Sequence, residues 1–413
     1  MKPEFFQKTV QLNPEKSTGK LRVSKLCELI DSHPYRDEIY SSFKISEIQD
    51  EIICIDYIDL VYERVKYYNE NYNRSFIYAQ VKDIDVYDDE QIIDGEINTD
   101  IIFNFEEYVE IDEVKNNLRT IAIYDAKNTF LDSYEMTKYA NNLFKIREGA
   151  LARQNIQYFK EKAKTNSKVN KHKSYRLVEY NSQFYLRGIT SINKYFEYGV
   201  DFTFVVSMLI LHQNMKYKVG VEYTIRSAAL NESKLDIIVS EKFLKDAGAF
   251  GSISTAVKIS TNDLGQGSLS FSNILSVGRI EKGFFIYRRK SEVEKNKEII
   301  PHTTKPENVF STFNNMEGVL NTSDEFIQEL NEIKSIKRPD ELRVKILAKI
   351  KNPRSALKGI TKLSDIFKWK IDNEISSFAK LIEMCENAED LEIEYDLKDK
   401  LRYIISDIML YGG

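Results

Sequence analysis

Short segments of alternating apolar and polar residues dominate the middle of this chain. Between residues 175 and 289 they recur with small or turn-forming residues between them: YRLVEY, QFYLRGIT, KYKVGVEYTIRSAAL, KLDIIVS, STAVKIS, SLSFSNILSVGRI and GFFIYRR. β-Branched and aromatic residues at alternate positions give a strand one buried face and one polar face. Short strands joined by tight turns favour antiparallel pairing, so we expect a mainly antiparallel sheet here.

Helical patterns flank and interrupt this region. Apolar residues recur every three or four positions across 133 to 162, and further helices are expected near 192 to 215 and through 322 to 410. The longest apolar run, residues 202 to 211, has ten residues, whereas a transmembrane helix needs about 20. We therefore expect a buried strand or core helix there, no membrane partner, and an α+β fold.

Changes in composition divide the chain into three expected domains. A length of 413 residues agrees with about two or three domains. The run from 160 to 176 holds seven Lys/Arg and one Glu among small polar residues, which is typical of a linker. We expect an acidic α+β domain over 1 to 160, an antiparallel β-rich domain over 170 to 310, and a basic helical domain over 322 to 413.

Opposite charges gather in two separate regions. Residues 47 to 115 contain 20 Asp/Glu and 5 Lys/Arg, whereas residues 334 to 370 contain 12 Lys/Arg and 3 Asp/Glu, in a chain whose net charge is −5. Each region is either a solvated face or a surface that docks on the opposite charge. The two regions can also pair with each other, within one chain or between neighbouring copies.

The basic region predicts a nucleic-acid surface. Lysine and arginine neutralise phosphates and release counterions, so such binding weakens as salt rises. Phe367 and Trp369, beside lysines, offer faces on which bases could stack. The side chains expected to contact phosphate are Arg343, Lys345, Lys349, Lys351, Arg354 and Lys358, with Lys168, Lys171 and Lys173 of the linker.

No complete catalytic motif stands in the sequence. It lacks GxxxxGK[ST], GxGxxG after a strand, HExxH and GxSxG. The three cysteines are far apart, at Cys27, Cys54 and Cys385, and the four histidines form no local pair. We therefore expect no disulfide framework, no metal centre and no cofactor, in a reducing, cytoplasmic setting.

One enzymatic alternative rests on Asp125 and Lys127, which follow the apolar stretch from 120 to 124. Divalent-metal nucleases often place such a pair at the end of a strand, where the carboxylate binds Mg²⁺ and the lysine orients the attacking water. Glu110, Asp112 and Glu113 could supply further ligands. A magnesium-dependent nuclease is therefore a third candidate function.

The stretch ISTNDLGQGSLSF, residues 259 to 271, predicts a hairpin. Asn262 and Asp263 initiate turns well, and Gly265 and Gly267 tolerate positive φ at no steric cost. A loop of this composition also exposes backbone N–H groups that can hold an anion. A plain turn and a binding loop therefore both stay open.

The same run, KISTNDLGQGSLSF, resembles the sNSEvGxGslxv signature of a family of uncharacterised phage- and plasmid-borne proteins. The segments YRLVEYNSQFYLRGITS and LDIIVS lie where that family has its entry strands, and His302 could match a later histidine, so the resemblance covers about 170 to 305. Where the family has Cys-Asn-Gly after the second strand, this chain has Val277, Gly278 and Arg279. The resemblance implies a mobile-element origin and assigns no chemistry.

These features together predict a non-enzymatic phage- or defence-associated protein that binds nucleic acid, DNA or RNA, through its C-terminal helices. The alternative is an oligomeric assembly module whose acidic and basic regions pair between subunits. In both cases we expect a homo-oligomer or a protein partner.

Overall fold

The structure, a computed structural model, describes residues 5–93, 96–162, 171–192, 194–264, 268–278, 283–288, 297–305, 308–309, 327–328, 330–332, 338–368 and 374–412. The chain divides into two compact units. Unit 1 consists of residues 1–5, 67–197 and 262–267, and unit 2 consists of residues 6–66, 198–261 and 268–413.

This division differs from the three expected domains. The boundary expected between 160 and 170 falls inside unit 1, because β8 (His172–Tyr180) pairs with β4 (Asn73–Gln80) along its length. The C-terminal helices belong to unit 2, because their apolar side chains form one core with those of its sheet. A shared core defines a domain more firmly than a change in composition does.

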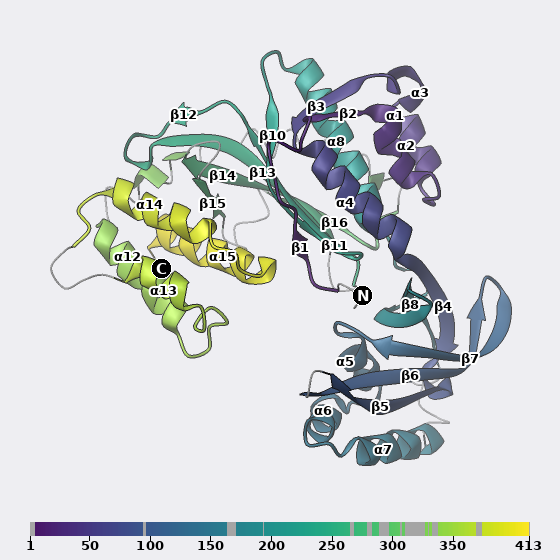
Figure 1. Ribbon diagram of the computed structural model, residues 1–413. Coiled ribbons are helices and arrows are strands. Elements are labelled where there is room, and N and C mark those ends of the chain that lie inside the picture. The colour runs from purple at the N-terminus through teal and green to yellow at the C-terminus, as the bar shows by residue number, and fades with distance from the viewer. Residues whose placement is uncertain are drawn as a thin grey trace. The chain divides into compact units, whose positions relative to one another are not determined.

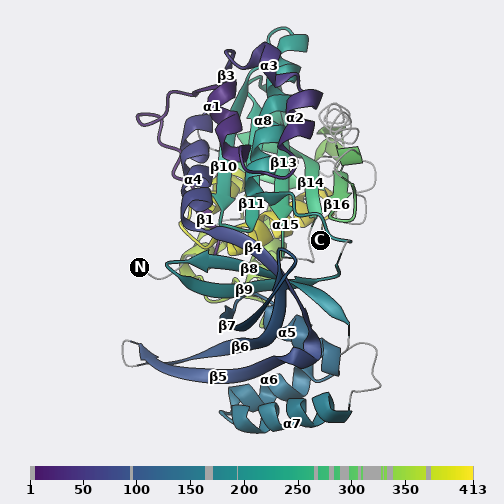
Figure 2. The same ribbon diagram turned by 90° about the vertical axis from the view of Figure 1, so that its right-hand side faces the viewer.

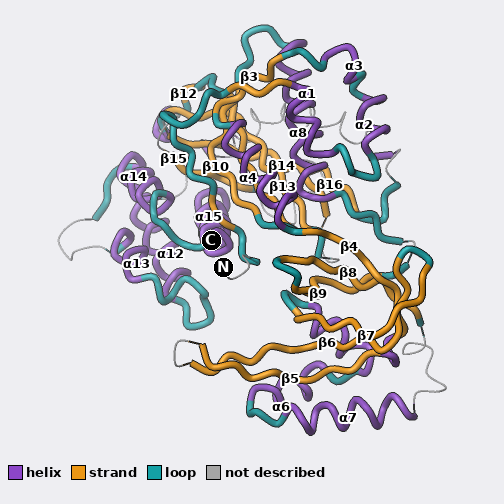
Figure 3. Tube along the Cα trace, turned by 45° about the vertical axis from the view of Figure 1, so that its right-hand side comes forward, coloured by secondary structure: helices purple, strands orange, loops and turns teal. Residues whose placement is uncertain are grey.

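Unit 1 is built on a six-stranded sheet with the order β4-β8-β9-β7-β6-β5. Figure 2 shows helices α5, α6 and α7 beside the strands β5 to β7, and Figure 3 shows β5 and β6 as a long pair. The remaining strands are β5 (Ile84–Ile93), β6 (Glu96–Glu110), β7 (Glu113–Ala122) and β9 (Gln183–Thr190). The helices are α5 (Ala126–Leu131), α6 (Thr137–Lys145) and α7 (Gly149–Lys162), with 3₁₀ turns η2 (Val81–Asp83) and η3 (Asp132–Tyr134).

The core of unit 1 lies between this sheet and the helices. Phe103 and Phe105 of β6 are buried, and Phe103 meets Phe130 of α5 edge-on with ring centroids 4.9 Å apart. Glu106 and Glu107 on the same strand are exposed. Part of the acidic excess of residues 47 to 115 therefore occupies the polar side of strands, where charge keeps its hydration.

Unit 2 is built on a ten-stranded sheet with the path β15-β14-β13-β11-β10-β3-β2, to which β1, β12 and β16 add (Figure 1). Its strands are β1 (Lys8–Thr9), β2 (Lys20–Arg22), β3 (Ile52–Asp56), β10 (Tyr223–Leu230), β11 (Lys234–Glu241), β12 (Lys245–Asp246), β13 (Ser252–Asn262), β14 (Ser268–Gly278), β15 (Gly283–Tyr287) and β16 (Lys297–Pro301). β13 and β14 form the expected hairpin, with Ser260 opposite Ser270 and Ile253 opposite Val277. β10 pairs with β3 in parallel, and the other strand pairs with a described register in unit 2 are antiparallel. The mainly antiparallel sheet and the α+β fold are confirmed.

Helices cover this sheet at both ends, and Figure 1 shows α12 to α15 gathered near β15 with α1 to α3 beside α8. The helices are α1 (Val23–Cys27), α2 (Arg36–Ser42), α3 (Ile45–Ile48), α4 (Ile58–Asn71), α8 (Gly199–Tyr217), α12 (Pro339–Lys351), α13 (Thr361–Phe367), α14 (Phe378–Glu389) and α15 (Tyr395–Tyr411), with 3₁₀ turns η1 (Glu28–Ile30) and η5 (Gly248–Phe250). Strand residues Leu275 and Val277 share a core with Ile346 of α12 and Leu381 of α14.

The apolar run from 202 to 211 forms the middle of α8 and is almost wholly buried. A helix that is apolar around its whole circumference belongs inside a core, so the core-helix interpretation is confirmed. Within the described ranges, no helix combines the length and the apolar character needed to cross a membrane.

Two expected boundaries differ from the observed ones. The strand expected from the apolar stretch at 120 to 124 ends at Ala122, and α5 starts at Ala126 after Tyr124, whose φ is +53°. The helix expected across 133 to 162 is divided into α6 and α7, because Arg147 takes a φ of +64°, which an α-helix does not accommodate.

Candidate functional site

A buried polar network joins the sheet of unit 2 to helix α15. Lys258 on β13 places its Nζ 2.6 Å from Oδ1 of Asp399 and 3.4 Å from Oδ1 of Asp236. Tyr287, at the end of β15, donates its hydroxyl to the same Asp399 oxygen at 2.9 Å. Lys258 is only 7% exposed. A charge this deeply buried needs such partners, so the network holds α15 in one position on the sheet.

The electrostatics of this network favour a structural role. Burial works against the charge of Lys258, but the groups around it, Tyr287 and Asp236 foremost, raise its pKa well above the ordinary value. An amine must lose its proton to act as a nucleophile or a base. Lys258 therefore stays protonated as a cation within this network.

Arg402 extends the network from α15 to α14. Its Nε lies 3.0 Å from Oε2 of Glu389 and its Nη2 lies 2.5 Å from Oε1, which makes a two-pronged ion pair. Nη2 also donates to the Ser227 hydroxyl of β10 at 3.2 Å. Burial opposes the charge of Arg402, but the groups around it, the Glu389 carboxylate foremost, together outweigh burial and raise the pKa of the guanidinium. The two last helices are thus tied to each other and to the sheet.

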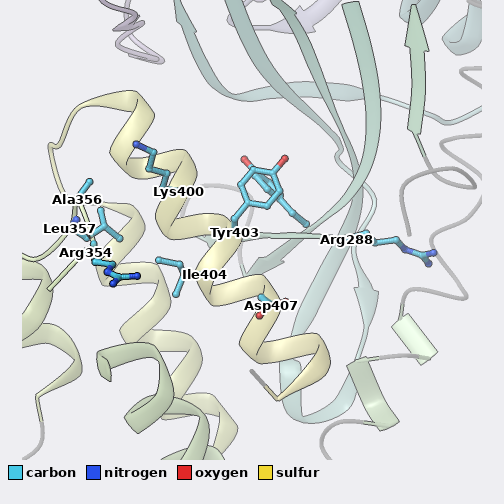
Figure 4. A pocket seen from close by; sticks show the side chains of 10 residues that line it. Arg288, Arg354, Ala356, Leu357, Lys400, Tyr403, Ile404 and Asp407 are labelled. Atoms are coloured by element: carbon cyan, nitrogen blue, oxygen red, sulfur yellow. Dashed lines mark hydrogen bonds between the residues drawn. The ribbon is translucent and has the colours of Figure 1, made fainter. Parts of the chain in front are cut away.

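A cavity of about 570 Å³ opens beside this network. Figure 4 shows Lys400, Tyr403, Ile404 and Asp407 along α15, with Arg354, Ala356 and Leu357 on the segment next to it. The lining residues come from α15 (Lys400, Tyr403, Ile404, Asp407), from the connection between α12 and α13 (Arg354, Ser355, Ala356, Leu357) and from the end of β15 (Tyr287, Arg288).

The cavity combines apolar walls with a charged rim. The ring of Tyr403 packs nearly perpendicular to that of Tyr287, with centroids 4.8 Å apart, and Leu357 is buried. Arg354 and Lys400 are exposed, and neither side chain has an ion-pair partner in the described part of the chain. Small-molecule sites are usually apolar clefts of about 300 to 1,000 Å³ with a few polar groups. This cavity has that size and character.

A smaller cavity, of about 220 Å³, meets a different face of α15 through Tyr395, Lys398 and Arg402. Its charged groups already have partners, since Arg402 pairs with Glu389 and the Lys398 amine donates to the Glu389 carbonyl at 2.7 Å. A ligand would have to displace these internal bonds. The larger cavity is therefore the better candidate site.

The structure separates the predicted phosphate-contacting residues into two groups. Arg343 is buried, with Nε 2.6 Å from Oδ1 of Asp340 and Nη1 donating to the Phe367 carbonyl at 2.9 Å. The Lys345 amine donates to the backbone carbonyl of Gly412. Both side chains therefore bond to other parts of the helical region. Arg343 is buried and is not exposed to a phosphate. Phe367 is buried as well, so it offers no stacking face, and Trp369 lies outside the described residues.

Lys349, Lys351, Arg354 and Lys358 remain exposed, at the end of α12 and in the segment after it. We call these four residues the basic surface. None of them has a side-chain ion pair with any residue that the structure describes. Pro339 at the start of α12, acidic residues in its first turn and lysines in its last turn match the helix dipole, so part of this pattern stabilises the helix itself.

The linker lysines do not form one continuous group. Lys168 lies outside the described residues, and Lys171 is exposed just before β8. Lys173 is half-buried and donates to the Ser133 hydroxyl at 2.8 Å, and burial lowers its pKa. Lys173 is therefore engaged within unit 1.

The predicted pair Asp125 and Lys127 lies at the start of α5, after the end of β7. Asp125 is exposed and accepts a hydrogen bond from Asn128 at 2.5 Å, whereas the Lys127 amine lies 5.6 Å from the centre of the Phe144 ring. Burial lowers the pKa of Lys127.

The acidic partners expected for Asp125 lie at the wrong end of the strand. Glu110 and Glu113 face each other where β6 turns into β7, and ten residues of strand, from Glu113 to Ala122, span about 30 Å. The described residues contain no cluster of three His, Cys, Asp or Glu side chains that could hold a metal.

The loop at 262 to 264 contributes to the interior of unit 1. Asp263 is fully buried and its carbonyl accepts a hydrogen bond from Nη1 of Arg176, while the Asn262 side chain caps the turn by accepting from the Leu264 N–H at 3.0 Å. Gly265 and Gly267 lie outside the described residues.

Arg176 belongs to a buried ion cluster with Arg187 and Glu197. Its Nε lies 3.1 Å from Oε2 of Glu197, and Nη2 of Arg187 donates to the other Glu197 oxygen. The two arginines lie on the adjacent strands β8 and β9, and the register shifts between Arg176 and Leu177. Such a bulge redirects a side chain, which explains how residues at positions 176 and 187 reach one carboxylate.

Sequence reasoning missed the residues that α15 contributes to the cavity. Lys400, Tyr403, Ile404 and Asp407 recur at intervals of three, four and seven, which is the spacing of one helix face. That pattern was available in the sequence. The sequence does not show that Arg354 and Leu357 line the same cavity, because they are more than 40 residues away from these α15 residues in the chain.

No family model matches this chain, and neither the curated proteins nor the solved structures include a match to it. The resemblance over 170 to 305 stays a prediction.

Proposed function

We propose that the protein binds nucleic acid through the basic surface of unit 2. The observation that carries the proposal is the contrast between these four cations and their neighbours. Lys368 pairs with Asp365 at 2.9 Å and Lys380 pairs with Glu383 at 2.8 Å, whereas the basic surface has no such partner within the described ranges. Cations without internal partners are available to neutralise phosphates, and that neutralisation releases the counterions condensed on the nucleic acid.

The proposal predicts how nucleic-acid binding depends on salt concentration. Each phosphate contact contributes about 0.7 to the slope of log K against log salt for a single strand and about 0.9 for duplex DNA. Contacts from all four residues would give a slope of about −3. The resemblance to phage- and plasmid-borne proteins supports a mobile-element or defence setting as part of the same proposal.

The test is a salt titration of binding to labelled single-stranded DNA, duplex DNA and RNA. The variant Lys349→Glu/Lys351→Glu/Arg354→Glu should lower the magnitude of the slope by about 2 and weaken binding at low salt. The control is Lys138→Glu/Lys145→Glu/Arg147→Glu, which changes net charge equally at exposed positions of unit 1. An equal loss in both variants would show that net charge, and not this surface, drives binding.

Light scattering in the same buffers tests the assembly alternative. If the wild-type protein binds no nucleic acid at low salt, and reversal of the basic surface lowers the molecular mass of an oligomer, the cations form a subunit interface. That result would replace the proposal.

A further inference from the structure

We infer that the cavity beside α15 binds a small aromatic acid, whose ring lies inside the cavity and whose acidic group pairs with Arg354. The inference goes beyond the proposed function, because this ligand is a free small molecule and not a nucleic acid. It rests on three properties of the lining, which are its apolar walls, its pair of tyrosine rings and its excess of positive charge.

The walls of the cavity suit a flat, apolar ligand. Leu357 is buried in the core of unit 2, and Ile404 packs against the same core. The rings of Tyr287 and Tyr403 meet nearly at right angles, with centroids 4.8 Å apart, and both residues line the cavity. Aromatic rings pack well edge-to-face and offset-stacked, so a third ring would extend this pair. Its apolar surface would also leave water for these walls, which is favourable.

The charged residues of the lining select an anion. They are three cations, Arg288, Arg354 and Lys400, and one carboxylate, Asp407. Arg288 and Asp407 each have an interaction within the protein. Arg354 and Lys400 are exposed and have no ion pair with any residue that the structure describes. Even if Asp407 neutralises one of the three cations, positive charge remains for a ligand.

Figure 4 shows how the two exposed cations are placed. Lys400 lies toward one end of the labelled part of α15, and Arg354 lies level with Ile404 and Asp407. They therefore do not form a single cationic end. A guanidinium holds a carboxylate through two parallel hydrogen bonds, whereas an ammonium acts as a point charge. Arg354 is thus the main partner of the acidic group, and Lys400 adds attraction at longer range.

The size of the cavity limits the ligand to a small molecule. Its volume is about 570 Å³, and small-molecule sites usually combine apolar walls with a few placed polar groups. An uncharged aromatic compound would contact the same walls but would gain nothing from Arg354. An aliphatic acid would reach Arg354 but would lose the ring contact with Tyr403. An aromatic acid uses both features of the lining.

The experiment measures the binding of anilinonaphthalene sulfonate to the native protein by its fluorescence, without nucleic acid. The comparison compound is phenylnaphthylamine, which has the same rings and no sulfonate. The wild-type protein should bind the sulfonate about 10-fold more tightly than the uncharged compound, because a hydrogen bond to a charged group contributes about that factor or more. The preference should shrink as salt rises, because both cations are exposed.

Substitutions locate the site. Ala356→Trp fills the mouth of the cavity at an exposed position and should abolish tight binding of both compounds. Its control is Ala379→Trp, an exposed alanine on α14 that does not line the cavity. Arg354→Ala should bring the affinity for the sulfonate close to that for the uncharged compound. Lys362→Ala removes an equal charge from an exposed position on α13, outside the lining, and should keep the preference.

Four results would overturn the inference. Binding of neither compound would show that the cavity takes no such ligand, and equal affinity for both would show that it does not select an anion. A preference that persists in Arg354→Ala would place the acidic group elsewhere. Binding of the sulfonate that persists in Ala356→Trp would place the compound outside the cavity.

A displacement assay tests the aromatic part of the inference. Naphthoate should displace the bound sulfonate at a lower concentration than decanoate does, since both carry one carboxylate and only naphthoate has rings. The reverse order would overturn the assignment of an aromatic ligand. Because nucleic acid is absent from all these measurements, their outcome is independent of the proposed function.

Discussion

Lys258 on β13 and Asp399 on α15 lie 141 positions apart in the sequence, and their Nζ and Oδ1 atoms are 2.6 Å apart in the fold. Asp399 faces the sheet, and the next residue, Lys400, lines the cavity. The buried ion pair therefore sets the rotation of the helix that supplies four of the cavity side chains. A residue that stabilises the fold, Asp399, and a residue that lines the candidate site, Lys400, are therefore neighbours in α15.

Asp399→Asn should destabilise unit 2. The change leaves the buried Lys258 amine with Asp236 at 3.4 Å as its remaining carboxylate, and breaking a buried pair costs about 3 kcal/mol or more. Urea unfolding followed by circular dichroism measures the loss. Glu392→Gln, at an exposed position before α15, should leave the unfolding midpoint almost unchanged. An equal midpoint in both variants would show that the pair contributes no stability.

Glu197→Gln should alter how stability depends on pH. Burial opposes the charge of Glu197, but Arg176 and Arg187 together outweigh it and lower the pKa of its carboxyl below the ordinary value. Because the pKa of Glu197 is lower in the folded state, its carboxylate contributes fully to the free energy of unfolding above the unfolded pKa of about 4.3. This contribution is lost as the pH falls toward the folded pKa.

The measurement for this variant is urea unfolding at pH 7 and at successively lower pH. At pH 7 the variant should be less stable by about 3 kcal/mol, and the difference should shrink as pH falls below about 4. A difference that stays constant over this range would contradict the role of the carboxylate charge. Glu106→Gln, an exposed position on β6, serves as the control.

Arg343 and Lys349 should respond in opposite ways to alanine. Arg343→Ala removes buried bonds to Asp340 and to the Phe367 carbonyl, so the free energy of unfolding should fall by about 2 to 3 kcal/mol. Lys349→Ala should leave stability almost unchanged and reduce the magnitude of the salt slope for single-stranded DNA by about 0.7. A lower slope in folded Arg343→Ala would show that Arg343 contacts phosphate after all.

The three cysteines should react with a thiol reagent at very different rates. Cys54 is exposed, whereas Cys27 and Cys385 are buried. Burial raises the pKa of Cys27 to about 12 and raises that of Cys385 as well, and the thiolate is the reactive form. One thiol should be modified quickly in the native protein and three after unfolding. Cys54→Ser should abolish the fast phase, and its persistence would show that a buried cysteine opens readily.

Local patterns predicted most elements of the fold. Alternation across 252 to 278 predicted the hairpin of β13 and β14, and the apolar run of α8 predicted a core element. These predictions depend on periodicities of two and of three to four residues, which neighbouring residues alone establish. The pairing of β8 with β4 could not be predicted from local patterns, because the paired residues are about 100 positions apart in the sequence.

The basic region shows why composition does not identify a site. Arg343 and Lys349 lie on one helix and are equally basic in sequence, yet Arg343 lies beside the buried stripe of Leu342 and Ile346 and reaches a backbone carbonyl on α13. Lys349 points to solvent. Which cations remain available depends on how α12 is rotated against the rest of unit 2.

By itself, the sequence determined the α+β class, the antiparallel hairpins, the core position of α8 and the basic character of the C-terminal region. These properties follow from residue spacing and residue chemistry over a few turns or strands. Only the tertiary structure decided which strands share a sheet, which cations are buried, and that Arg354 and Lys400 line one cavity. Those outcomes depend on contacts between distant segments, because burial and pairing are properties of the packed chain and not of any one segment.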